Sequence, residues 1–260
     1  MSTEFYTALA EHYDALFRIE KTTLRFLTDH GAVHGARVLD VACGSGAYTR
    51  ALVDRGVDAF GTDLSDAMID RARSCGLAAD RCEVADMLDA RDHHAAPFDL
   101  VFCIGNSIAH LSSYDDVSRF VASAADALCA GGTLVLQFVD VSDLPVDGER
   151  RLPALQGPGV EFERTYRRVG ADAIHFDARL IVESNRSNRP ASGAPRTADL
   201  SQRLLLLSAD RIERMLCACG FGSVLVYGGF GAAPPRPDSW VRVVVASRAR
   251  PETVEEPCPD

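Results

Sequence analysis

The chain has 260 residues, 47% of them hydrophobic, which suits one α/β domain with an elaboration or at most two small domains. Its formal net charge of −10 argues against a nucleic acid or an anionic membrane as partner, because both are bound through basic patches. No apolar run approaches the roughly 18 residues of a membrane span, and no signal-type segment follows the first residues. We therefore expect a cytoplasmic protein.

The eight cysteines are scattered along the chain. The close pair Cys217 and Cys219 lacks the Cys-x-x-Cys spacing of a zinc site. We expect reduced cysteines that pack as small hydrophobic residues, and no metal.

Helical spacing of apolar residues predicts two N-terminal helices, over residues 4–17 and 19–30. Strand-like and helix-like segments then alternate five times. The expected strands are 37–42, 57–62, 81–85, 98–104 and 133–139, and the expected helices are 48–55, 65–75 and one from 113 to the glycines at 131–132. Ser65 and Ser113 are read as N-caps. Such alternation predicts a doubly wound parallel sheet with helices on both faces and ligands at the carboxyl ends of its strands.

The pattern changes after Val139. Residues 140–159 are rich in Pro and Gly and are expected to form a loop. Further elements are then expected: an antiparallel hairpin (160–169 and 174–183), a mobile loop (184–197), an inserted strand (201–207), a helix capped by Ser208 and closed by Gly220, and two strands (223–227 and 240–247).

Three acidic residues fall at the ends of the first three strands: Asp40, Asp63 and Asp86. The first strand also runs into a turn with Gly44 and Gly46, which lets backbone approach a ligand. An acid after the second strand can accept both hydroxyls of a ribose. The third glycine of a dinucleotide motif is missing, and Asp40 suits a cationic group better than a phosphate.

Three segments resemble the S-adenosylmethionine motifs of class I methyltransferases: Val38–Gly46, Gly61–Met68 and Val84–Met87. The resemblance covers about residues 5–140. It implies a Rossmann-like α/β fold, with a seven-stranded, mostly parallel sheet whose last strand is antiparallel. It also implies an enzyme that uses S-adenosyl-L-methionine. The residues that these motifs imply bind the cofactor are Ala42, Gly44, Gly46, Asp63, Leu64, Met68, Asp86 and Met87. Asp40 and Cys103, at the ends of the first and fourth strands, are further candidates, and Tyr13 of the first expected helix is a candidate to contact cofactor or substrate. Arg18 matches the arginine with which the glycine N-methyltransferases, which this chain resembles, hold the cofactor's carboxylate.

Other roles for some of these residues stay open. Asp63 could simply cap the following helix, and Asp86 could be a solvated turn residue. Leu64 and Met68 could be ordinary core residues, because a Met at helical spacing usually is.

A narrower resemblance lies after the fourth strand. Gly105–Leu111 is similar to the same turn of the glycine and glycine/sarcosine N-methyltransferases, where its Asn lies by the acceptor. Those enzymes also have an Arg beyond the fifth strand that binds the amino-acid carboxylate. Here the matching stretch is Phe138–Asp140, with no cation, which argues against glycine as the acceptor.

The expected organisation is N-terminal lid helices (1–35), a cofactor-binding core (36–139), an antiparallel substrate-binding insertion (140–200), the C-terminal part of the core (201–249) and a disordered tail (250–260). The catalytic candidates are Asn106, which would orient the acceptor, and His110, which is either a base or a buried structural histidine. Substrate-binding candidates are Tyr6, Asn106, Tyr166, Arg179, Tyr227 and Phe230.

The favoured function is N-methylation of a small molecule, since an amine needs only a lone pair and no strong base. Transfer to oxygen or carbon of a natural-product intermediate is the alternative. Two hypotheses from other functional classes are a cofactor-binding scaffold without activity and a dinucleotide oxidoreductase. The exposed hairpin edge could also pair two subunits into a homodimer.

Overall fold

The computed structural model describes residues 9–92, 94, 97–183, 195–236 and 238–249. Its larger sheet has seven strands in the order β10-β11-β5-β4-β1-β2-β3. The strands are β1 (Arg37–Val41), β2 (Asp58–Asp63), β3 (Cys82–Val84), β4 (Phe98–Cys103), β5 (Leu128–Val139), β10 (Phe221–Tyr227) and β11 (Val241–Arg248). Strand β11 is antiparallel to both neighbours, and the other pairs are parallel. The expected sheet, with its antiparallel last strand, is confirmed.

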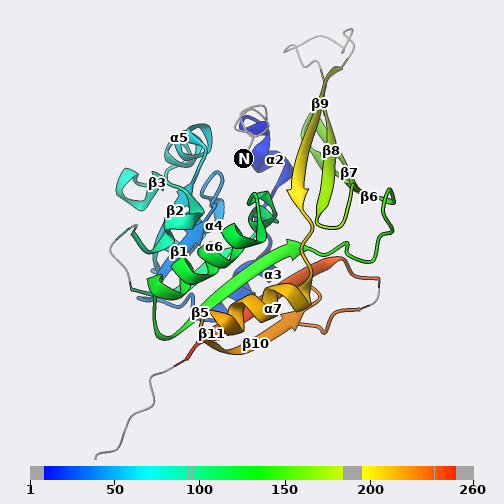
Figure 1. Ribbon diagram of the computed structural model, residues 1–260. Coiled ribbons are helices and arrows are strands. Elements are labelled where there is room, and N and C mark those ends of the chain that lie inside the picture. The colour runs from blue at the N-terminus through cyan, green and yellow to red at the C-terminus, as the bar shows by residue number, and fades with distance from the viewer. Residues whose placement is uncertain (1–8, 93, 95–96, 184–194, 237, 250–260) are drawn as a thin grey trace, which may run out of the picture.

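Helices cover both faces of this sheet (Figure 1). The helices are α2 (Tyr13–Leu16), α3 (Lys21–Asp29), α4 (Ala47–Val53), α5 (Asp66–Ser74), α6 (Tyr114–Ala127) and α7 (Ala209–Ala218), with 3₁₀ turns η1 (Ala79–Arg81), η2 (Met87–Asp92) and η3 (Ser107–His110). Apolar side chains of α3 and α4 form one core with the sheet, and those of α6 and α7 form a second core on the opposite face. The continuous helix expected over 4–17 is wrong in its described part, since residues 10–12 are turns.

A second, four-stranded antiparallel sheet has the order β6-β7-β8-β9. Its strands are β6 (Glu149–Gly157), β7 (Val160–Arg168), β8 (Ala173–Val182) and β9 (Arg196–Leu205). It stands beside α2, above the larger sheet (Figure 1), and α2 packs on its apolar face through Leu16 and Phe162. The last strand continues to Leu205, into the stretch that the sequence assigned to the C-terminal core.

The loop expected over 140–159 is wrong in its second half, because β6 occupies Glu149–Gly157. Pro153 lies within this strand, where the pairing register with β7 shifts between Leu152 and Leu155. Proline lacks a backbone N–H and is tolerated at an edge or a bulge. Strand β6 is an edge with such an irregularity, so the chain accommodates a residue that reads as a strand breaker.

The fifth strand begins at Leu128, earlier than expected at 133, and its register with β4 shifts between Phe98 and Leu100. Gly132 lies at this irregularity, where a Cβ would come within 3.1 Å of the Phe98 carbonyl oxygen. Gly131 and Gly132 therefore lie within β5, where the absence of a side chain on Gly132 lets the strand pass close to β4, and they do not separate the strand from α6.

Candidate active site

The turn after β1 brings backbone, not side chains, to the carboxyl edge of the sheet. Ala42, Gly44 and Gly46 all have positive φ angles, of 59°, 57° and 65°. A Cβ on Gly46 would lie 2.8 Å from Leu77 Cδ2, and one on Gly44 would lie 3.1 Å from the Tyr13 hydroxyl oxygen. Both glycines are thus required, one by packing under α5 and the other by close contact with α2.

Asp40 is buried at the end of β1, with 2% of its surface exposed. Its Oδ2 accepts a hydrogen bond of 2.7 Å from the Thr49 hydroxyl. Burial, with a smaller effect of the Asp63 charge, raises the pKa of Asp40 to about 8. No ion pair joins Asp40 to a residue that the structure describes, so a cationic ligand would relieve this buried carboxylate.

Asp63, at the end of β2, bridges two backbone segments. One carboxylate oxygen accepts the Gly44 N–H at 2.9 Å, and the other accepts the Ser65 N–H at 2.9 Å. Burial raises its pKa, and these two bonds oppose that rise. Ser65 occupies the N-cap position of α5, but its side chain makes no capping bond. Each oxygen keeps one further acceptor position, and Asp63 lines a small cavity together with Met68.

Helix α2 is fastened over this turn by Asp14. Its carboxylate accepts a hydrogen bond from the Ser45 hydroxyl and pairs with Arg71 of α5 at 3.0 Å. Tyr13, the neighbouring residue, is held against the glycine turn, and burial followed by the Asp63 charge raises its pKa. The lid that the sequence expected over the first residues thus has a described part that contacts the turn directly.

Three adjoining cavities meet at Tyr13 and Gly105. One, of about 530 Å³, is lined by Arg18, Asp40, Ala42 and other residues of the first strand and α3 region. A small one, of about 30 Å³, lies beside Asp63. The third, of about 270 Å³, lies between the turn after β4 and the antiparallel sheet. A ligand held against the glycine turn therefore adjoins a separate chamber.

Asn106 connects that chamber to the larger sheet. It has a φ of 66° and is 7% exposed. Its Oδ1 accepts the Val139 N–H at 2.9 Å, and its Nδ2 donates to the Tyr166 hydroxyl oxygen at 3.2 Å. Because Val139 can only donate, the orientation of the amide is fixed. The Gly105 N–H similarly donates to the Gln137 side-chain oxygen at 2.6 Å.

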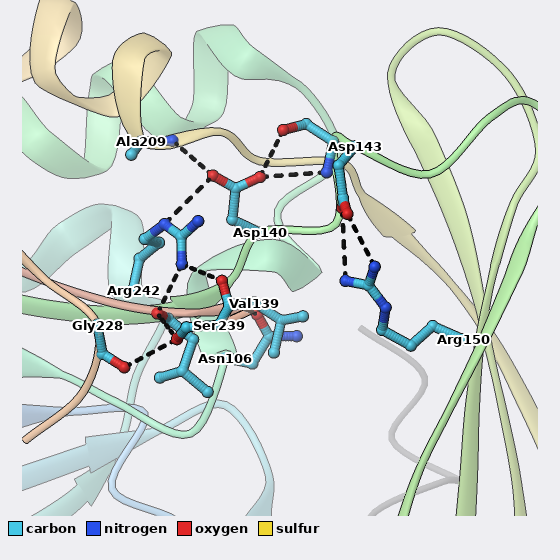
Figure 2. Close-up of polar contacts among 11 residues, drawn as sticks. Asn106, Val139, Asp140, Asp143, Arg150, Ala209, Gly228, Ser239 and Arg242 are labelled. Atoms are coloured by element: carbon cyan, nitrogen blue, oxygen red, sulfur yellow. Dashed lines mark hydrogen bonds and ion pairs between the residues drawn. The ribbon is translucent and has the colours of Figure 1, made fainter. Parts of the chain in front are cut away.

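Asp140 secures the end of β5, next to Val139 (Figure 2). It accepts hydrogen bonds from Ser142 and from the Ala209 N–H at 3.2 Å, and it lies 3.7 Å from the Arg242 guanidinium. Ser208 occupies the expected N-cap position of α7, but its side chain makes no capping bond, and Asp140 accepts the N–H of the first helical residue instead. The carboxylate joins β5, α7 and β11. It lies in the stretch Phe138–Asp140, where the glycine N-methyltransferases have an Arg and this chain has no cationic residue.

His110 borders both the 270 Å³ chamber and the small cavity beside Asp63. Burial is the main cause that lowers its pKa to about 4. Its imidazole is therefore neutral at physiological pH, which makes it a hydrogen-bonding group in either tautomer and a weak base.

Aromatic rings form much of the chamber wall. The Tyr13 ring lies 4.7 Å from the Phe17 ring, tilted by 32°, and Phe17 meets Phe162 edge-on at 6.0 Å. Tyr166 lies 5.1 Å from Phe176, and the wall also includes Trp240. The sequence singled out only two of these residues, Tyr13 and Tyr166.

Arg164 and Gln137 line the chamber and were missed by the sequence reading. Phe162, Arg164 and Tyr166 alternate along β7, so they share one face of the strand. This period of two was readable in the predicted hairpin and would have pointed to Arg164. No such signal identifies Gln137, whose role depends on the pairing of β5 with β4.

Several other candidates lie away from these cavities. Leu64 is 37% exposed, while Met87 and Cys103 are buried in the core. Asp86 accepts the Leu88 N–H at 3.0 Å, which is the turn role left open for it.

The candidate substrate-binding residues lie in different parts of the structure. Phe230 lines the 530 Å³ cavity, but Tyr227 packs on Phe26. Arg179 pairs with Asp199 in a groove on the outer face of the antiparallel sheet. Tyr6 lies outside the described residues.

The described residues show neither a membrane-spanning helix nor a metal site. None of their helices is long and apolar enough to cross a membrane. They also contain no group of three or more His, Cys, Asp or Glu side chains placed to hold a metal ion.

Comparison with known proteins matches residues 38–132 to a methyltransferase domain family. The chain is 26% identical to a glycine/sarcosine N-methyltransferase of Aphanothece halophytica over 210 residues, 80% of this chain and 73% of the relative. It is 30% identical to a ubiquinone biosynthesis O-methyltransferase of Idiomarina loihiensis, over 47% of this chain and only 50% of the relative. Among solved structures, the sugar N-methyltransferase KedS8 from Streptoalloteichus superposes with a TM-score of 0.65 and 25% identity, covering 94% of this chain and 88% of that one.

The site fits the cofactor of these proteins. Two buried carboxylates without an ion-pair partner among the described residues, Asp40 and Asp63, lie beside a backbone turn that leaves room for close approach. They suit a ligand that carries positive charge and hydroxyl groups. The fold, the matched domain and this site agree: the chain is a class I S-adenosylmethionine-dependent methyltransferase.

Proposed function

We propose that the enzyme N-methylates a small-molecule amine bound in the 270 Å³ chamber. The observation that carries this proposal is the chamber's lining: none of the described residues that line it is acidic, and His110 there is neutral. Such surroundings do not stabilise an ammonium ion, so an amine is favoured as its free base. The free base has the lone pair that the reaction needs.

The extent of the sequence matches supports nitrogen. The glycine/sarcosine N-methyltransferase aligns with 80% of this chain, whereas the O-methyltransferase aligns with 47%. The longer match extends beyond the matched domain, residues 38–132, into parts of the chain that line the chamber. The N-methyltransferase is therefore the better guide to the acceptor, although its own acceptors are not transferred to this chain.

In this proposal the larger sheet holds the cofactor. The backbone at Ala42, Gly44 and Gly46 faces its methionine part, Asp40 balances its positive charge, and Asp63 accepts its ribose hydroxyls at the free acceptor positions. Met68 borders the same space. Arg18, on the rim of the 530 Å³ cavity, would pair with its carboxylate.

When bound, S-adenosylmethionine supplies an activated methyl group on a sulfonium, and its sulfur keeps the bonding electron pair as the methyl leaves. Little acid–base chemistry is left to the protein, whose contribution is alignment and exclusion of water. Tyr13 and Gly105 line both the 270 Å³ chamber and the 530 Å³ cavity, so they lie where the two meet. There they would restrict the direction from which the acceptor reaches the methyl group. Asn106 fixes Tyr166 in the chamber wall, and the methylated nitrogen loses its proton to water.

The test is incubation with methyl-labelled S-adenosylmethionine and pairs of acceptors that differ only in an amino or hydroxyl group. Mass spectrometry identifies the methylated atom. We expect label on nitrogen, with kcat/KM rising as pH approaches the pKa of the amine. Label on oxygen alone, from the hydroxyl member of each pair, would refute N-methylation while leaving the methyltransferase assignment intact.

A further inference from the structure

Arg164 is the one cationic side chain among the described residues that line the 270 Å³ chamber. The other basic residue there, His110, is neutral. It lies on β7 between Phe162 and Tyr166, which are 1% and 4% exposed, so its side chain shares their inward face. Opposite it stand Leu152 of β6 and the small Ala178 of β8.

The hydrogen bonding of this guanidinium is incomplete. Nη2 donates to the Pro153 carbonyl oxygen at 2.9 Å, whereas the buried Nε has no hydrogen-bond partner. No carboxylate among the described residues pairs with it. Burial accordingly lowers its pKa from the usual range. A guanidinium presents five donors, so several remain for a ligand.

Neighbouring arginines on the same sheet behave differently. Arg151 pairs with Glu163, Arg167 with Asp177 at 2.9 Å, and Arg179 with Asp199 at 2.6 Å. These pairs lie on the outer, solvent-facing side. These three outward arginines thus each have a carboxylate partner, whereas Arg164, in a chamber walled by aromatic rings, has none among the described residues.

We infer that the methyl acceptor carries an anionic group, of the carboxylate type, on an otherwise apolar or aromatic body, and that Arg164 binds this group. This inference rests on the proposed function, because it takes the chamber as the acceptor site. A carboxylate matches the planar fork of a guanidinium and can accept two parallel hydrogen bonds. The aromatic wall from Phe17 to Phe176 then contacts the apolar body.

The stretch after β5 was expected to lack a cation for an acidic acceptor, and Asp140 there is occupied by α7 and Arg242. Arg164 provides that charge from the antiparallel sheet instead. The anionic group would enter from the side of β7 and leave the opposite end of the acceptor near Asn106 and His110, which border the same chamber.

The test measures binding separately from turnover. Isothermal titration of the enzyme saturated with S-adenosylhomocysteine compares 3-phenylpropionate with the neutral 3-phenylpropionamide. We expect the carboxylate to bind about ten- to hundred-fold more tightly, the range of a charged hydrogen-bonded contact. Arg164→Met should abolish this preference, Arg164→Lys should retain part of it, and Arg179→Met, on the outer face, should leave it unchanged. Thermal unfolding verifies that each variant is folded.

Two results would overturn the inference. One is equal binding, or no binding, of the two probes by the wild-type complex. The other is a loss of S-adenosylhomocysteine affinity in Arg164→Met without a change in probe preference, since Arg164 also borders the 530 Å³ cavity and would then serve the cofactor's carboxylate. Failure of the proposed function gives a different result. If the enzyme prefers the carboxylate probe but methylates hydroxy acids and not amino acids, only nitrogen as the acceptor atom is refuted, and the role of Arg164 stands.

Discussion

Replacing Asp40 with Asn should change how cofactor binding depends on pH. Asp40 is buried, borders the 530 Å³ cavity and accepts a hydrogen bond from the Thr49 hydroxyl. Burial raises its pKa to about 8, so the cofactor-free enzyme holds a proton there at neutral pH. A positively charged ligand favours the ionised carboxylate. Binding of S-adenosylmethionine should therefore expel that proton.

The size of the effect follows from the pKa. If the cofactor binds only to the ionised form, its affinity should rise about ten-fold per pH unit below pH 8 and level off above it. Between pH 6 and pH 9 the gain is about a hundred-fold. At pH 6.5 about one proton should be released for each cofactor bound.

Calorimetric titration measures both quantities, with proton release obtained from two buffers of different ionisation enthalpy. Asp40→Asn should bind S-adenosylmethionine more weakly at pH 9 and show neither the pH dependence nor the proton release. Asp70→Asn, an exposed residue of α5, is the matched control and should behave as the wild type. An unchanged affinity from pH 6 to pH 9 in the wild type, without proton release, would refute the reasoning.

The same carboxyl group affects stability in the cofactor-free enzyme. Its folded pKa lies above the unfolded value of 3.8, so the folded state is favoured when the group is protonated. Its contribution to the free energy of unfolding falls by about 1.4 kcal/mol per pH unit between pH 4 and pH 8. Asp40→Asn should remove this slope, which denaturant unfolding at several pH values would reveal.

Gly46→Ala should destabilise the fold by about 1–3 kcal/mol in urea unfolding, because its φ is positive and the new Cβ would meet Leu77; a loss below about 0.5 kcal/mol would contradict the packing argument. Asp140→Ala should cost about 1–3 kcal/mol, since it removes the hydrogen bond to the α7 N-terminus and the carboxylate partner of Arg242; a wild-type melting temperature would refute this. Asn106→Ala should lower kcat/KM about ten- to hundred-fold with cofactor affinity unchanged in calorimetry. Unaltered rates would remove the turn after β4 from the mechanism.

The parallel sheet was predictable because strand-like and helix-like segments alternate along residues 37–139. The same logic placed Asp40 and Asp63 at one edge, since the carboxyl ends of parallel strands meet there. These features depend on local patterns and on a rule of topology, so a single sequence carries them.

Features made by distant pairings were not predictable. The side chain of Asn106 meets Tyr166, 60 residues later, and Asp140 caps α7 at Ala209, 69 residues later. Nothing local to Ser208 shows that its capping role is taken by another residue. Strand β6 was missed because Pro153 reads as a breaker, and only its position at a sheet edge makes it acceptable.

That edge position has a consequence for assembly. An edge strand normally offers unpaired N–H and C=O groups to a strand of another molecule. Pro153 has no N–H to offer, its carbonyl oxygen accepts from Arg164, and the irregular register beside it breaks the regular repeat that a partner strand would need. Pro153, which made β6 unpredictable from the sequence, thus also prevents the antiparallel sheet of one molecule from continuing through β6 into that of another. Any homodimer built by strand addition to this sheet would have to use β9.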